Sequence, residues 1–108
     1  MPDYEVWIEA ECWEEGTWTP EVCNTDVVVT FEEGSAWAAT FFSYANILSL
    51  AKKNQQTGEC LSGKWFWASN MALVDTTTRA IIEAVIADML AEDEFNLIFV
   101  RCPPDHNG

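Results

Sequence analysis

Apolar and polar residues alternate with a period of two from Tyr4 to Trp13. In this segment the even-numbered residues are apolar, whereas the odd-numbered residues are glutamate or tryptophan. A period of two places the two sets on opposite faces of a strand, so the pattern predicts a first strand with one buried face. Polar residues with Gly16 and Pro20 interrupt the pattern over residues 14–24, which predicts a loop.

Two segments rich in β-branched and aromatic residues come next, at residues 26–31 and 36–42. The four residues between them include Gly34, which tolerates the backbone conformations of a tight turn. This arrangement predicts a hairpin formed by the second and third strands.

A helical period begins after Ser43 and predicts a helix over residues 44–55. Ser43 is a suitable N-cap because its side chain can accept a hydrogen bond from a backbone N–H of the first turn. Gly58 ends the helix. We expect its inner face to hold Tyr44, Ile47, Leu48 and Ala51.

The rest of the pattern predicts a fourth strand over residues 64–74, interrupted near Ser69, then a second helix and a last strand over residues 95–101. Asp75 and three threonines are candidate caps for the second helix, which extends to about Ala91. Its apolar residues at helical spacing are Ile81, Ile82, Val85, Ile86, Met89 and Leu90.

The element order β-β-β-α-β-α-β predicts an α+β domain. We expect a mostly antiparallel sheet of about five strands with two helices on one face, and a second face that is solvated and strongly acidic. The crossover between the last two strands should be right-handed if they pair in parallel. Residues 1–102 are expected to form a single domain, and residues 103–108 a disordered tail.

Charge narrows the classes of partner. The 108 residues include 18 Asp and Glu against 5 Lys and Arg, which gives a net charge of −13. Binding to nucleic acid needs a basic surface, and an anionic membrane would repel this chain. No apolar run is long enough for a spanning helix. An aromatic content of 13% nevertheless indicates a folded domain and not a disordered acidic one.

The acidic residues are concentrated near the N-terminus, where residues 1–33 hold ten carboxylates and no lysine or arginine. Three tryptophans lie among them, and tryptophan is enriched at binding hot spots. A field of one sign attracts partners of the opposite charge, so this segment predicts a surface for a basic protein. The candidate partner-binding residues are Glu5, Trp7, Glu9, Glu11, Trp13, Glu14, Glu15 and Trp18. Alternatively, the tryptophans pack under the loop and the acids only keep the protein soluble.

Catalysis has little support in the sequence. The single histidine, His106, lies in the predicted tail, which leaves a serine or cysteine nucleophile without an ordered base. Glu9 and Glu11 could act as an acid and base pair, but a domain of this size rarely has the deep cleft that such chemistry needs. We therefore expect no enzymatic activity and no cofactor.

Metal binding is also not expected. The acidic residues lack the spacing of a calcium loop. The four cysteines form no CxxC pair, and the first residues lack the basic segment of a secretory signal. We expect buried free thiols in a cytoplasmic protein, with disulfides as the main alternative.

Two segments resemble a group of small, acidic, uncharacterised bacterial proteins: TFEEGSAW followed by TFF, at residues 30–37 and 40–42, and TGECLSGKWFWASNM at residues 57–71. That resemblance covers most of the chain and implies no activity. In size and acidity the chain is also similar in type to immunity proteins of bacterial toxin systems and to phage-encoded nuclease inhibitors such as anti-CRISPR proteins.

These features together predict a non-enzymatic inhibitor. Its acidic face, with carboxylates spaced like phosphates, would occlude the basic nucleic-acid-binding surface of a nuclease or effector. An immunity protein that plugs a toxin without mimicking nucleic acid is a related possibility. The alternative from another class is a small cytoplasmic sensor domain that binds a ligand between the sheet and the helices.

Overall fold

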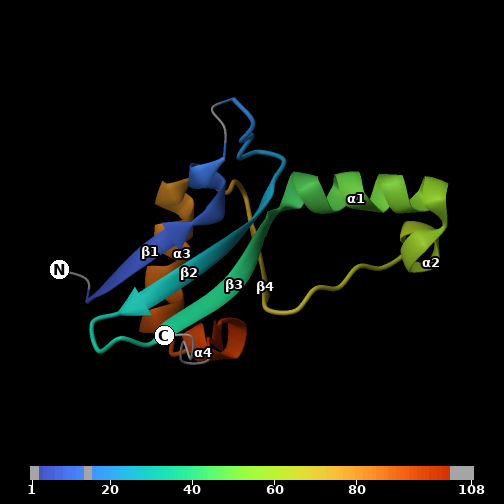
Figure 1. The fold of residues 1–108 in the computed structure, drawn as a ribbon. Helices are drawn as coiled ribbons and strands as arrows, with labels where there is room; N and C mark the ends of the chain where they lie inside the picture. The colour runs from blue at the N-terminus through green and yellow to red at the C-terminus, as the bar shows by residue number, and fades with distance from the viewer. Residues whose placement is uncertain (1–2, 14–15, 103–108) are drawn as a thin grey trace, which may run out of the picture.

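A five-stranded sheet organises the chain (Figure 1, which shows the computed structural model of the protein). The structure describes residues 3–13 and 16–102. The strands are β1 (Tyr4–Ile8), β2 (Asn24–Phe31), β3 (Ala36–Ser43), β4 (Met71–Val74) and β5 (Val100–Arg101). The first three strands form an antiparallel meander. The other edge of β3 is shared by β4, which is parallel to it, and β5, which is antiparallel to it. The predicted α+β class with a mostly antiparallel sheet is confirmed.

The first strand is shorter than predicted. It ends at Ile8, and residues Glu9–Cys12 form a 3-10 turn, η1. The reason lies in Ala10, whose side chain is buried and whose N–H donates to Oγ1 of Thr25 at 2.9 Å. A backbone donor that bonds a side chain of β2 cannot continue the strand ladder. The alternation therefore stops, and the prediction that Glu11 and Trp13 share a face with Trp7 is wrong.

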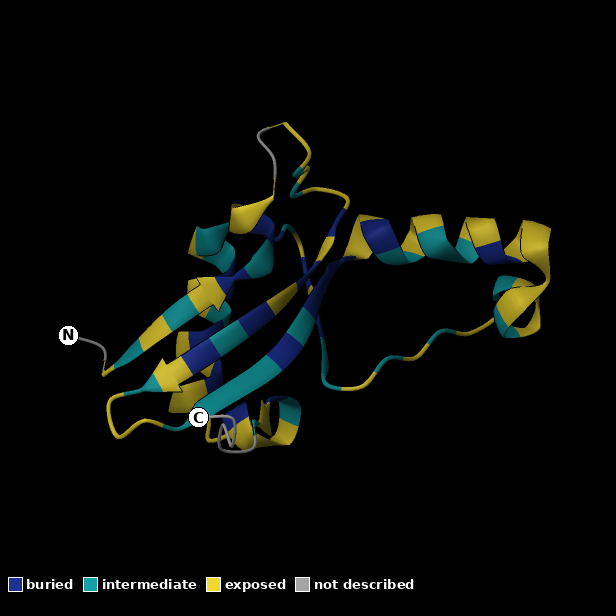
Figure 2. Ribbon diagram, in the orientation of Figure 1, coloured by how far each residue is buried: buried dark blue, intermediate teal, exposed yellow. Residues whose placement is uncertain are grey.

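Strand register divides the sheet into a covered face and an open face. On the covered face lie the buried side chains of Ile8, Val27, Val29, Ala39 and Phe41. Residues of the open face alternate with them along the same strands (Figure 2). Glu5 lies there, as predicted, and so does Asp26. The centre of the open face, however, is apolar and not strongly acidic, because Glu9 and Glu11 left the strand with the 3-10 turn.

Two helices pack against the covered face, α3 (Arg79–Ala91) and α4 (Phe95–Ile98). Thr78 caps α3 through its side chain, which accepts from the N–H of Ile81, and the predicted second helix is confirmed. The core contributed by this layer consists of Ile82, Ile86, Met89, Phe95 and Phe99. The two helices on one face are therefore present, but the second of them is α4 and not the helix that begins at Tyr44.

The segment that contains α4 was predicted as a strand over residues 95–101. Only Val100–Arg101 is a strand, whereas Phe95–Ile98 is helical. A helical turn brings Phe95 and Phe99 into a stack with ring centroids 4.3 Å apart, and both rings enter the core. Alternation would have sent the two rings to one face of a strand at a greater separation. Packing of this aromatic pair therefore favours a helix here, although the residues have a high propensity for strands.

The segment 44–70 leaves the sheet as an arm (Figure 1). It contains α1 (Tyr44–Thr57), α2 (Glu59–Gly63) and a linker that returns to β4. The N-cap at Ser43 and the stop at Gly58 are confirmed, since Oγ of Ser43 accepts from the N–H of Asn46 at 3.1 Å and Gly58 is left-handed. The predicted inner face is wrong, because Tyr44 and Leu48 are exposed and the buried residues of α1 are Asn46 and Asn54.

The length of the fourth strand and the pairing of the last two strands also differ from the predictions. The fourth strand spans Met71–Val74 only, and residues 64–70 form no strand. The parallel pair is β3 with β4, joined through the arm, whereas β4 and β5 each pair with β3. The last two strands do not pair with each other, so the condition for a right-handed parallel crossover between them is not met. The predicted tail, residues 103–108, lies outside the described residues.

Candidate protein-binding surface

The structure separates the predicted partner-binding residues. Glu5 and Trp7 lie on the open face of the sheet, where the Trp7 side chain is 47% exposed. Glu9 is half-buried, and its Oε1 accepts from the N–H of Asp26 at 3.4 Å. Glu14 and Glu15 lie outside the described residues. The described members of this set therefore do not all lie on one face of the sheet.

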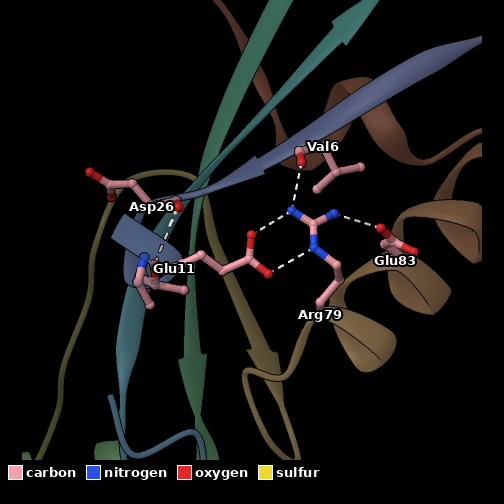
Figure 3. A network of polar contacts seen from close by, with 7 residues as sticks. Val6, Glu11, Asp26, Arg79 and Glu83 are labelled. Atoms are coloured by element: carbon pink, nitrogen blue, oxygen red, sulfur yellow. Dashed lines mark hydrogen bonds and ion pairs between the residues drawn. The ribbon is translucent and has the colours of Figure 1, made fainter. Parts of the chain in front are cut away.

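Glu11 belongs to a network that ties η1 to β1 and α3 (Figure 3). Its two carboxylate oxygens accept from Nη2 and Nε of Arg79 at 2.7 and 2.8 Å. Arg79 also donates to Oε2 of Glu83 at 2.6 Å and to the carbonyl oxygen of Val6 at 2.9 Å. These hydrogen bonds lower the pKa of Glu11, against a smaller effect of burial, and the same bonds raise the pKa of Arg79. Glu11 thus links η1 to α3, and its charge is already paired.

The tryptophans divide between the core and the surface. Trp18 packs against the core, and its Nε1 donates to Oγ1 of the fully buried Thr77 at 3.3 Å. For Trp18 the structure therefore supports the alternative interpretation, in which the tryptophan packs within the protein and does not form a binding surface. Trp13 is 37% exposed and lines a shallow hollow of about 200 Å³ together with Cys23 and Asn46.

The β2–β3 hairpin and the α3–α4 turn lie at the same end of the sheet (Figure 1), and both contain carboxylates, of which Glu33 and Asp93 border one hollow. The backbone N–H of Glu32 donates to the carbonyl oxygen of Asp3 at 2.9 Å, which brings the N-terminal strand to the hairpin. We call this group the acidic end; it comprises Asp3, Glu32, Glu33, Glu92, Asp93 and Glu94. In the described part of the chain both ion pairs belong to Arg79, so neither involves these carboxylates.

An apolar hollow of about 430 Å³ lies within the acidic end. Three aromatic rings line it, and Trp37 and Phe31 each meet the ring of Phe95 edge to face, with centroids 5.7 and 5.5 Å apart. Glu33 comes to this hollow from the hairpin and Asp93 from the helix turn. Aromatic faces beside carboxylates are suited to a guanidinium or ammonium group, which interacts with both.

Local hydrogen bonds hold Glu33 in its charged form. Its Oε1 accepts from the backbone N–H of Ser35 at 2.8 Å and also from the Ser35 hydroxyl. These two bonds lower the pKa of Glu33, and Arg101 adds a weaker effect in the same direction. The turn itself therefore positions the carboxylate, and the lowered pKa favours its charged form.

Glu92, Asp93 and Glu94 were not among the residues predicted from the sequence. They follow the last turn of α3, where the partial negative charge of a helix end favours lysine or arginine. Three successive acids at a helix C-terminus are electrostatically unfavourable for the helix. That conflict is visible in the sequence, and it could have indicated a role other than stability.

The described residues contain no group of three or more His, Cys, Asp or Glu able to hold a metal ion. All four cysteines are free. Cys23 is buried, Cys60 and Cys102 are half-buried, and Cys12 is exposed, so the expectation of buried thiols is wrong for Cys12. No described helix is long and apolar enough to cross a membrane.

Comparison of the chain with protein-family models, curated proteins and solved structures finds no match. The resemblances drawn from the sequence therefore stay predictions, and the function has to be argued from the surface itself.

Proposed function

We propose that the protein is a non-enzymatic, cytoplasmic inhibitor that binds a basic protein and occludes its nucleic-acid-binding surface. Proteins that bind nucleic acid expose lysine and arginine side chains to contact phosphates. An acidic protein that presents carboxylates to those side chains competes with the nucleic acid. The partner would be a nuclease or effector of this basic kind.

The observation that carries the proposal is the acidic end with its aromatic hollow. Glu33 and Asp93 border the hollow, and the rings of Phe31, Trp37 and Phe95 line it. An arginine of the partner could stack on a ring while it bonds a carboxylate, which combines a cation–π contact with a charge-assisted hydrogen bond. The surrounding acids would speed the encounter by long-range attraction.

The alternative of a ligand-binding sensor domain receives less support. The space between the sheet and α3 is filled by fully buried side chains, among them Phe41, Ile82, Ile86 and Phe99. In addition, the groups with shifted pKa values, Glu11, Glu33 and Arg79, are each explained by an ion pair or a turn. They therefore need no catalytic explanation.

The proposal is tested by capture from a lysate of the native host with the natural protein and with the double variant Glu33→Lys/Asp93→Lys. The captured protein should be a basic nucleic-acid-binding protein. At low salt the double variant should associate with it at least about tenfold more slowly, and the difference should shrink as salt screens the charges.

The matched control is the double variant Glu21→Lys/Asp75→Lys, which makes the same change of charge at exposed residues outside the acidic end. It should slow association much less. Equal slowing by both variants would show that only the net charge matters. A captured partner without a basic surface would contradict the proposal itself.

A further inference from the structure

The arm, residues 44–70, carries apolar side chains that its own chain leaves exposed. Leu48 is 67% exposed, Leu61 70% and Trp67 69%, while Tyr44 and Trp65 are also exposed (Figure 2). A helix in a protein is stabilised mainly by packing of an apolar face. The buried residues of α1 are instead polar, Asn46 and Asn54. The arm therefore has an apolar surface without matching burial.

The open face of the sheet also carries apolar side chains that are partly exposed. Register places Trp7 opposite Val28, Val28 opposite Ala38, and Ala38 opposite Val100. These four side chains form an apolar row across β1, β2, β3 and β5, in which Trp7 and Val100 are about half exposed. The row lines a hollow of about 350 Å³, whose border also includes Asp26, Thr40 and the last two residues of the arm, Ser69 and Asn70.

The arm and the rest of the chain carry net charges of opposite sign. The arm holds Lys52, Lys53 and Lys64 against a single acid, Glu59, which leaves it with two net positive charges. The rest of the chain carries seventeen Asp and Glu against two Arg. On the open face, Glu5 and Asp26 lie one row to either side of the apolar row.

The helices α1 and α2 of the arm are poorly placed to cover the row of the same chain. The returning linker does reach the sheet, because Ser69 and Asn70 line the hollow and the ring of Phe66 meets that of Phe42. The arm starts after Ser43 and returns at Met71, which pairs with Thr40, so both of its ends are attached to the same end of β3. From there α1 projects away from the sheet, and the linker returns to β3 at Thr40, whereas the row crosses β3 at Ala38 (Figure 1).

We propose that two copies of this chain form a closed pair in which the arm of each lies across the open face of the other. Apolar side chains of one arm would enter the hollow over the partner's row, and the arm lysines would lie near the carboxylates of that face. One arrangement repeated by a twofold axis satisfies both copies at once. The acidic end, at the hairpin and the α3–α4 turn, is not part of this contact, so the inference is independent of the proposed function.

The test uses two double variants and measures mass in solution by light scattering. The arm variant is Leu48→Asp/Trp67→Asp, and the face variant is Trp7→Lys/Val100→Lys. All four side chains are exposed, so both variants should fold, which circular dichroism and a urea midpoint would verify. The natural protein should have twice the single-chain mass of 12.2 kDa. Each variant alone should have the single-chain mass.

Mixing the two variants should restore the doubled mass. The natural arm of the face variant can then dock on the natural face of the arm variant, and the second contact joins new aspartates to new lysines. The control Leu97→Asp, at an exposed residue of α4 outside both surfaces, should leave the pair intact.

Several results would overturn the inference. A natural protein that keeps the single-chain mass at millimolar concentration has no such pair. An arm variant that still doubles would indicate contact between two sheets, and a face variant that still doubles would indicate contact between two arms. Failure of the mixture to recover the doubled mass, or a ladder of larger oligomers, would exclude the closed exchange of arms.

Discussion

Arg79 shows how one side chain can connect three parts of a fold. Its guanidinium bonds the carboxylate of Glu11 on two oxygens and the carbonyl oxygen of Val6, and it pairs with Glu83 one turn further along α3. The planar fork of arginine suits this arrangement, whereas a lysine at the same position could not make the paired contact. The pair is about one-third exposed, so solvent reduces its energetic effect.

We expect the substitution Glu11→Gln to lower the free energy of unfolding by about 0.5–1 kcal/mol at pH 7. The pKa of Glu11 is lower in the folded chain than its ordinary value of 4.5, so its stabilisation is present above that pH. It is lost as the pH falls through the folded-state pKa, because the protonated carboxyl no longer pairs with Arg79.

Urea unfolding of the natural protein and the variant at pH 7 and at pH 3 measures this change. The difference between the two proteins should shrink at the lower pH. Glu5→Gln, a change at an exposed carboxylate of β1, serves as the control and should have little effect. A difference that does not depend on pH would show that packing, and not the ion pair, accounts for the effect.

Among the elements, α2 has the least common backbone. Cys60, Leu61 and Ser62 all adopt left-handed φ values, of 52°, 53° and 58°. Such conformations cost roughly 1–2 kcal/mol for each residue with a side chain. The turn returns the chain onto α1, where Gly63 lies so close that a Cβ would be 2.3 Å from the carbonyl oxygen of Ala51. Gly63 therefore allows the close contact between the two helices of the arm.

The substitution Gly63→Ala should destabilise the arm by more than about 2 kcal/mol, because the new methyl group meets backbone atoms and the φ of 82° is strained for alanine. Hydrogen exchange of the α1 amides measures this local loss. The control is Gly58→Ala in the same arm, where φ is 86° but nothing lies within 4 Å of the added atom. The control should cost only about 1 kcal/mol. Equal effects would mean that backbone strain alone explains the requirement for glycine.

The negative charge of the whole chain affects both its stability and the binding that we propose. The acids at the end of α3 oppose the helix dipole, and they add to a large negative charge that has few cations to offset it. Residues that reduce stability without a compensating contact are often found at functional surfaces. We therefore interpret the acidic end as a surface whose electrostatic cost is offset when a partner binds.

We expect Glu92→Lys to raise the free energy of unfolding by about 0.3–1 kcal/mol, because it places a cation at the negative end of α3. Urea unfolding at low salt measures the gain. The neutral variant Glu92→Gln should show a smaller gain, which separates removal of an acid from addition of a cation. A loss of stability would instead reveal a contact that the wild-type carboxylate makes at the helix end.

Local signals in the sequence were sufficient for several elements. The turn around Gly34 and the β-branched segments on either side predicted the hairpin, and Ser43 predicted where α1 begins. For α3 the sequence offered four candidate caps, of which Thr78 is the one used. These features depend on neighbours a few residues apart, so pattern and capping chemistry are enough to predict them. The acidic character of the surface also follows from composition, since carboxylates remain exposed unless they are paired.

Contacts between distant residues decided the rest. The end of β1 depends on the hydrogen bond from Ala10 to Thr25, and Glu11 changed from a candidate recognition residue to a structural one through Arg79, 68 residues away. Phe95 became helical because its ring stacks on Phe99 within the core. The direction of the arm followed from the parallel pairing of β3 and β4. Amphipathic pattern shows which side chains seek burial, but only the packed tertiary structure determines what each of them meets, because those partners come from distant parts of the chain.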